Sequence, residues 1–156
     1  MTLKILNLGC GYVKIKGAVN VDIRQETNPD YVMDLENLEM YRPTLKENSF
    51  DKVIALEILE HIKNTGQFLT EIRRVLKPNG ILKIKVPYHG VIQNIWFSIF
   101  KFEDVFNPTG DHVRFYTLPS IRRVLRDYGF DIIYEELTNS KLFFHEHIII
   151  EAKVLK

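Results

Sequence analysis

The hydrophobic positions of the chain follow two periods. Short apolar runs rich in Leu, Ile and Val either alternate with polar residues or form compact blocks, as at residues 53–56, which is typical of strands. A compact block fits a strand that is buried on both faces. We expect strands at residues 3–8, 17–22, 31–35, 49–59, 81–88, about 131–138 and about 143–154.

Two longer stretches repeat their apolar residues at helical spacing, at residues 65–80 and 117–130. Pro78 and Gly80 are expected to end the first helix, and Thr117 is a suitable N-cap for the second. The apolar faces consist of Phe68, Leu69, Ile72, Val75 and Leu76 in the first helix and Ile121, Val124, Leu125 and Tyr128 in the second.

Strands and helices alternate through the middle of the chain, which predicts an α/β fold with a mostly parallel sheet. The last two strands are separated only by a few residues around 138–141, a length typical of a hairpin. One of these two strands must therefore run antiparallel to its neighbour.

Composition narrows the class of protein without naming a function. The chain has 156 residues, 46% hydrophobic and 26% charged, which predicts a single domain over residues 1–156. The net charge of +1 gives no general attraction to nucleic acid or acidic lipid. Cys10 is the only cysteine, and no signal peptide or membrane span is recognisable. We expect a cytoplasmic protein without membrane or nucleic-acid partners.

A glycine turn follows the first expected strand, in "LNLGCGYVKIKGAVNVDI". Backbone N–H groups at Gly9 and Gly11 can approach a ligand closely, and Asp22 at the end of the next strand can accept hydrogen bonds from ribose hydroxyls. The turn by itself is equally compatible with a purely structural role.

Two other nucleotide sites fit poorly. A dinucleotide motif requires a third glycine, where this chain has Lys14, and an acid about 20 residues further on. Asp22 instead follows Gly11 by 11 residues, so no pyrophosphate-binding helix fits between the strands. The Gly-Lys-Ser/Thr of a P-loop is absent from the sequence.

Further blocks follow this turn in a recognisable order. They are "VMDLENL", "ENSFDKVIALEILEHI", "FLTEIRRVLKPNGILKIKVP" and "DHVRFYTLPSIRRVLRDYGF". Together with the glycine turn, they make nearly the whole chain resemble the class I S-adenosylmethionine-dependent methyltransferases, especially the small type 11 group. The resemblance implies a Rossmann-like seven-stranded sheet with an antiparallel last strand, and S-adenosylmethionine as cofactor.

The resemblance also implies a cofactor site. In that family the glycine turn wraps the methionine part, an acid in the position of Asp22 binds the ribose, and an acid in the position of Asp34 lies near the adenine. Asp34 is also compatible with a helix cap and Glu57 with a solvated residue. The implied set is Leu8, Gly9, Cys10, Gly11, Tyr12, Asp22, Ile23, Asp34, Leu35 and Glu57.

The chain departs from this family at its N-terminal side. The helix that usually joins the first two strands is reduced to a loop, and no helical material precedes the first strand. Part of one sheet face should therefore lack its usual cover, and exposed apolar area there would cost about 25 cal/mol per Å². We expect either a second copy of the chain, forming a homodimer, or the aromatic residues at 91–106 to cover this face.

An aromatic segment at about 89–116 lies where the family places its substrate-facing insert. It carries Trp96, Phe97, Phe100, Phe102 and Phe106. These aromatics suit an acceptor pocket, but core or dimer contacts explain them as well. If the acceptor is a hydroxyl, the candidates for a general base are His89 and His112, with Tyr88 orienting the acceptor, and each of the three can equally be structural. His61 is expected to have a structural role.

No metal site is predicted, although His145 and His147 share one face of the last strand. The sequence favours methyl transfer to a small or sugar-containing acceptor. The alternative is a non-catalytic binding or partner subunit that keeps the methyltransferase fold, since a fold alone does not establish catalysis.

Overall fold

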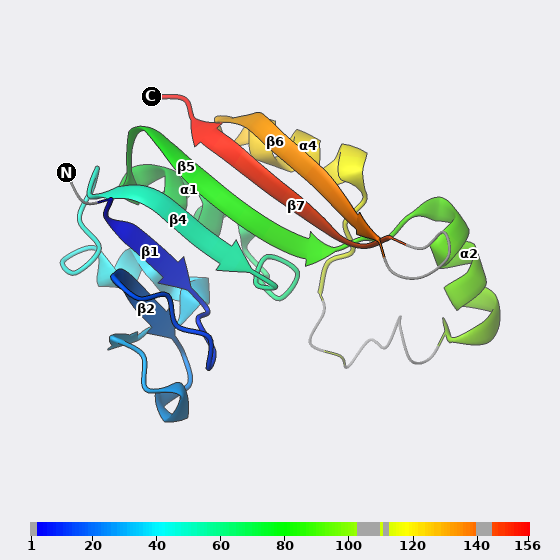
Figure 1. The fold of residues 1–156 in the computed structure, drawn as a ribbon, viewed down its shortest axis with the longest axis horizontal. Helices are drawn as coiled ribbons and strands as arrows, with labels where there is room; N and C mark the ends of the chain where they lie inside the picture. The colour runs from blue at the N-terminus through cyan, green and yellow to red at the C-terminus, as the bar shows by residue number, and fades with distance from the viewer. Residues whose placement is uncertain (1–2, 103–109, 111–112, 140–144) are drawn as a thin grey trace.

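A seven-stranded mixed sheet forms the centre of the structure, in the order β3-β2-β1-β4-β5-β7-β6 (Figure 1). The computed structural model describes residues 3–102, 110, 113–139 and 145–156. The first five strands are parallel, and β7 runs antiparallel to both β5 and β6. This confirms the predicted seven-stranded sheet with an antiparallel last strand. The strands are β1 (Ile5–Leu8), β2 (Ala18–Asp22), β3 (Tyr31–Val32), β4 (Phe50–Leu56), β5 (Leu76–Pro87), β6 (Phe130–Asn139) and β7 (His145–Val154).

The helical segments are η1 (Gln25–Thr27), η2 (Leu35–Tyr41), α1 (Thr65–Val75), α2 (Val91–Phe100) and α4 (Leu118–Asp127). Of these, η2, α1 and α4 cover the same side of the sheet (Figure 1). Leu38 of η2, Ile72 of α1 and Leu125 of α4 join strand residues in a single core. Thr117 caps α4 as predicted, because its side chain accepts a hydrogen bond from the backbone N–H of Ser120.

The first long helix ends earlier than its apolar pattern predicts. Helix α1 stops at Val75, and Leu76 already begins β5, where it pairs with Phe50 of β4. Pro78 explains the difference, because the residue before a proline avoids the helical conformation. The last apolar position of the predicted helix thus belongs to the sheet.

Alternation along β5 shows that the sheet buries one face. Leu82, Ile84 and Val86 are fully buried beneath the helices, whereas Lys83 and Lys85 between them point to the opposite, open face. Strand β7 alternates in the same way. The sequence run "ILKIKVP" is therefore an amphipathic strand rather than one buried on both faces.

Ion pairs cross the open face from strand to strand. The Nζ atom of Lys52 lies 2.9 Å from Oε1 of Glu151, and that of Lys83 lies 3.5 Å from the same atom. At β5 and β7 this face carries charged side chains that need no cover, whereas Ile54 of β4 is buried on the same face. A homodimer through this face stays a prediction.

Helix α2 does not cover the open face. It lies beyond the carboxyl end of β5 (Figure 1) and leaves Ile95, Trp96, Ile99 and Phe100 exposed. The expectation that the aromatic segment covers the sheet is therefore wrong for this helix. Phe106 lies outside the described residues.

The short connection between β1 and β2 is anchored by two buried asparagines. Nδ2 of Asn7 donates to Oδ1 of Asn20 at 3.0 Å, and Asn20 also exchanges hydrogen bonds with the backbone of Ile15 at 2.9 and 3.2 Å. The backbone N–H of Asn20 donates to Asp30 at 2.7 Å. Hydrogen bonds to loop backbone thus replace the packing of a helix over β1 and β2.

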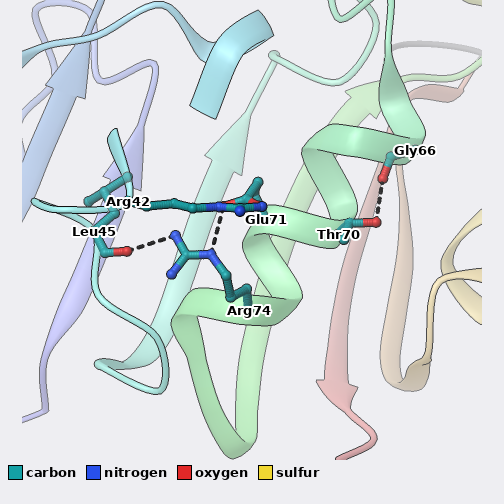
Figure 2. Close-up of polar contacts among 6 residues, drawn as sticks. All are labelled: Arg42, Leu45, Gly66, Thr70, Glu71 and Arg74. Atoms are coloured by element: carbon teal, nitrogen blue, oxygen red, sulfur yellow. Dashed lines mark hydrogen bonds and ion pairs between the residues drawn. The ribbon is translucent and has the colours of Figure 1, made fainter. Parts of the chain in front are cut away.

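Arg42, at the end of η2, and Arg74, on α1, converge on the buried carboxylate of Glu71 (Figure 2). Arg74 also donates to the backbone oxygen of Leu45 at 2.7 Å. Burial alone would raise the pKa of Glu71, but the two guanidinium groups outweigh it and lower this pKa. The cluster fastens η2, which forms one side of the cavity described below, to α1.

Replacing Asn20 by Ala should lower the free energy of unfolding by about 2 kcal/mol, because Asn7 and the Ile15 backbone lose buried partners. Urea denaturation measures this change. Asn37→Ala, at an exposed position, should cost less than about 0.5 kcal/mol. Equal effects of the two variants would show that the asparagine network does not hold the connection.

Glu71→Ala should destabilise the protein by about 2 kcal/mol at pH 7, because it removes the partner of both arginines. The folded-state pKa of Glu71 is lowered from 4.5. Its stabilisation is therefore complete above pH 4.5 and disappears as the pH falls through the lower folded-state value. Denaturation curves from pH 7 to 3 test this, with the exposed Glu47→Ala as control. A difference that does not shrink in acid would contradict the ion-pair explanation.

Candidate functional site

A cavity of about 790 Å³ opens at the carboxyl ends of β1, β2 and β4. Such an edge is where open α/β sheets bind ligands. Its walls come from the turn after β1, the end of β2, the start of η2, the segment after β4, and Gly110 and Val113. The lining residues are Gly9, Asp22, Ile23, Arg24, Asp34, Leu35, Glu36, Leu56, Glu57, Ile58, His61, Ile62, Lys63, Gly110 and Val113.

Asp22 ties the glycine turn to the end of β2. Its Oδ2 accepts a hydrogen bond from the backbone N–H of Gly11 at 2.7 Å, and its Oδ1 accepts one from that of Arg24 at 2.9 Å. Gly9 adopts φ +65°, and a Cβ there would lie 2.0 Å from Cδ1 of Ile58. A side chain at Gly9 would therefore both strain the backbone and displace Ile58.

The Asp22 carboxylate is charged at neutral pH although it is buried. Burial alone would raise its pKa, but hydrogen bonds from the backbone N–H groups of Arg24 and Gly11 and from the Arg24 guanidinium outweigh this and lower it. The guanidinium also lies over the Tyr12 ring, 5.9 Å from its centroid. A fixed negative charge thus stands at the base of the cavity.

Two acids at the start of η2 shape the neighbouring wall. Asp34 caps η2, with its side chain accepting from the backbone N–H of Glu36 at 2.9 Å. Glu36 in turn accepts from the backbone N–H of Lys63 at 2.7 Å. This hydrogen bond links η2 to the segment after β4, so it fixes one wall of the cavity relative to the other.

The wall after β4 is joined to residues 113 and 114. The backbone oxygen of Glu60 accepts from the N–H groups of Val113 and Arg114 at 3.0 and 3.2 Å. Arg114 also donates to the Ile62 and Lys63 backbone oxygens at 3.2 and 2.6 Å. The two segments form one connected wall.

Glu57, at the end of β4, has an unusual backbone. Its φ of 55° lies in the left-handed region, which costs a residue of this kind about 1 kcal/mol. Its Oε1 lies 2.9 Å from Nζ of Lys85 and 3.2 Å from Nε2 of His147. Side chains from β4, β5 and β7 therefore meet at this corner of the cavity.

Glu60 lies behind Glu57 and is only 1% exposed. Its carboxyl shares a hydrogen bond with that of Glu57 and accepts one from its own backbone N–H. Burial, together with the nearby Glu57 carboxyl, raises the pKa of Glu60 to about 8. Glu60 is therefore protonated at neutral pH, unlike Asp22 in the same site.

Six residues of the expected cofactor site line the cavity, namely Gly9, Asp22, Ile23, Asp34, Leu35 and Glu57. Leu8 and Cys10 are buried, Tyr12 is exposed, and Gly11 reaches the site through its bond to Asp22. Sequence analysis missed Arg24, Glu36, Lys63 and Glu60. The acids in "LEILEH" were a signal, since Glu57 and Glu60 are three residues apart directly after a buried strand.

Two of the expected catalytic residues, Tyr88 and His89, are not among the residues that line this cavity. His89 is buried with its ring edge-on to Phe115 at 4.8 Å, and its backbone N–H donates to Tyr116 at 2.8 Å. Tyr88 forms an isolated bridge with Tyr116. His112 and the side chain of His145 lie outside the described residues. Among the described residues no group of three or more metal-ligating side chains is suited to a metal ion.

No helix in the described part of the chain is long and apolar enough to cross a membrane.

Replacing Glu60 by Gln should stabilise the protein in alkali. The folded-state pKa of about 8 lies above the ordinary value of 4.5 for this side chain, so the wild type loses stability as the pH rises from 4.5 to about 8. Gln is neutral throughout, so its advantage should be about 2 kcal/mol at pH 9 and close to zero at pH 4. Denaturation at both pH values tests this, with Glu136→Gln as an exposed control. A constant difference between the two pH values would contradict the raised pKa.

Comparison with known proteins agrees with this geometry. Residues 4–135 match a family model described as a methyltransferase domain. The ubiquinone biosynthesis O-methyltransferase of Rickettsia canadensis is 33% identical over 95 residues, which cover 51% of this chain and 40% of that protein. The chain therefore spans less than half the length of this relative.

Solved structures share the fold at low sequence identity. The 1,6-didemethyltoxoflavin-N1-methyltransferase of Burkholderia thailandensis, solved with S-adenosylhomocysteine, gives a TM-score of 0.71 at 16% identity, over 99% of this chain and 72% of that one. A SAM-dependent methyltransferase of Methanosarcina mazei gives 0.74 at 18% identity, over 98% and 92%. Since the family model covers most of the chain, this protein belongs to the methyltransferase-domain family, and its predicted resemblance to the class I S-adenosylmethionine-dependent methyltransferases is confirmed.

Proposed function

We propose that this chain binds S-adenosylmethionine in the cavity and transfers its methyl group to a small-molecule or glycan acceptor. The observation that carries the proposal is the position of Asp22. Its charged carboxylate lines the cavity and is held against the glycine turn at 2.7 Å. A carboxylate at the end of the second strand can accept hydrogen bonds from both ribose hydroxyls.

The residues around the cavity fit this ligand. A volume of about 790 Å³ lies within the usual range for small-molecule sites. Asp22 would hold the ribose, and Asp34 with the Leu35 backbone would lie at the adenine. Gly9 lets the turn pack directly against Ile58 of the cavity wall, because a Cβ there would lie 2.0 Å from Cδ1 of Ile58.

The bound cofactor would supply an electrophilic methyl group on a sulfonium centre. The chain's own contribution is orientation: correct alignment of the acceptor is worth several kcal/mol of the barrier. Leu56, Ile58 and Ile62 give the cavity an apolar wall that excludes water. A net charge of +1, with lysines of the open face paired to acids, favours a small acceptor over nucleic acid.

Calorimetric titration with S-adenosylmethionine and S-adenosylhomocysteine tests the proposal, with NAD as control ligand. We expect micromolar binding of the first two and none of NAD. Asp22→Ala and Asp22→Asn should weaken binding about 10- to 100-fold through lost ribose hydrogen bonds. Asp131→Ala, at an exposed position of β6, should bind like wild type.

Failure of a folded sample to bind either compound would overturn the proposal and favour the non-catalytic partner subunit. Unchanged affinity in both Asp22 variants would remove Asp22 from the site.

A further inference from the structure

Glu57 and Glu60, just after β4, form a pair of carboxyl groups, and cofactor binding does not require both of them. Glu57 lines the cavity, and Glu60 lies directly behind it, shielded from solvent. The two carboxyl groups interact, since each unit of charge on Glu57 opposes ionisation of Glu60. Two neighbouring carboxyl groups in a cleft are a common arrangement in enzymes that transfer a proton.

The backbone indicates that the Glu57 side chain is needed at this corner. The other non-glycine residues with positive φ in the described part of the chain are asparagines, Asn28, Asn48 and Asn79, which tolerate this conformation. Glu57 adopts it at φ 55° without that tolerance. Such strain gathers at functional sites, where the position of the side chain compensates for it.

Basic side chains contact Glu57 directly. Lys85 from β5 and His147 from β7 lie 2.9 and 3.2 Å from its Oε1. Glu60 has no basic side chain in contact within the part of the chain that the structure describes. It faces Tyr116 and Glu57, with whose carboxyl its own shares a hydrogen bond, and the charge of Lys85 also acts on it. The Glu57 carboxylate is thus paired with Lys85, and Glu60 beside it can take or release one proton.

We propose that Glu57 and Glu60 together form the proton acceptor of methyl transfer, and that the methyl acceptor is therefore a hydroxyl compound. This inference rests on the function proposed above. The acceptor oxygen uses a lone pair to form the new C–O bond while the C–S bond breaks and its electron pair returns to sulfur. The hydroxyl proton moves to Glu57 and is then shared with Glu60, so charge and atoms balance.

The charges at this corner favour a hydroxyl over an amine. An ammonium group would add a second cation beside Lys85, whereas a neutral hydroxyl donates a hydrogen bond to Glu57 without changing the charge. Glu57 is the catalytic residue, because it lines the cavity. Glu60 is a positioning residue that acts through Glu57.

The pair should make the reaction dependent on pH. While Glu60 keeps its proton, it can share it with Glu57 and reduce the basicity of that carboxylate. Once Glu60 ionises, near the raised pKa of about 8, the pair can take the acceptor's proton. Lys85, His147 and Tyr116 remain beside the pair throughout.

The first experiment needs no acceptor. Protein labelled with ¹³C at the glutamate carboxyl carbons is titrated by NMR from pH 5 to 10, free and saturated with S-adenosylhomocysteine. One carboxyl should titrate between pH 7 and 9 in the wild type and in Glu136→Gln, and this signal should be absent in Glu60→Gln. In Glu57→Gln the remaining Glu60 should titrate at lower pH, because the neighbouring charge has gone.

The second experiment measures methyl transfer from S-adenosylmethionine to phenol and to benzylamine as probes. With phenol, kcat should rise about tenfold per pH unit below pH 8 and level off above it. Glu60→Gln should flatten this profile and lower kcat at least 30-fold at pH 9, with KM changed less than threefold. Glu136→Gln should behave like wild type.

Loss of cofactor binding in the wild type would defeat the proposed function itself, and calorimetry detects this separately. With cofactor bound, the proton-acceptor role is overturned by any of four results. These are no carboxyl titrating between pH 7 and 9, an unchanged profile in Glu60→Gln, transfer to benzylamine or to neither probe, or removal of the titration by added Mg²⁺, which would make the carboxyls cation ligands.

Discussion

One face of the sheet is covered by helices, and the rest of the structure follows from how the other face does without them. Helices η2, α1 and α4 share a core with Leu82, Ile84 and Val86, while the other face carries Lys52, Lys83 and Glu151 paired across strands. An apolar face left open would cost about 25 cal/mol per Å². Charged side chains avoid that cost at β5 and β7, and at β1 and β2 the same face carries the buried, hydrogen-bonded Asn7 and Asn20 in place of apolar residues.

In place of a helix between β1 and β2, hydrogen bonds from side chains to the backbone fix the positions of the loops. Asn20 holds the short connection, Asp22 holds the glycine turn, and Glu36 holds the segment after β4. Each bond joins segments that are far apart in the chain or would otherwise be free loops. The cavity is therefore built from short loops whose positions are set by polar groups rather than by packed helices.

The hydrogen-bond partners of Asp22 and Glu60 determine whether each of these carboxyl groups is charged. Asp22 and Glu60 are both buried, which by itself favours the neutral form. Three donors from Gly11 and Arg24 keep Asp22 charged, whereas the carboxyl of Glu60 shares its hydrogen bond with another acid, Glu57, and is more deeply buried. One carboxyl is therefore suited to bind hydroxyls permanently, and the other to exchange a proton near neutral pH.

The order of strands and helices, the antiparallel hairpin, the cap at Thr117 and the family were all determined by the sequence, because periodicity, turn residues and block order are local properties. The same local pattern predicted a longer α1 than the structure has. It also did not show that one face of the sheet carries charged side chains. It could not place Lys85 beside Glu57 either. These depend on which strands become neighbours and on which groups lose water. Strand order and burial arise only when distant segments pack together, and they decided the charge state of each acid in the cavity.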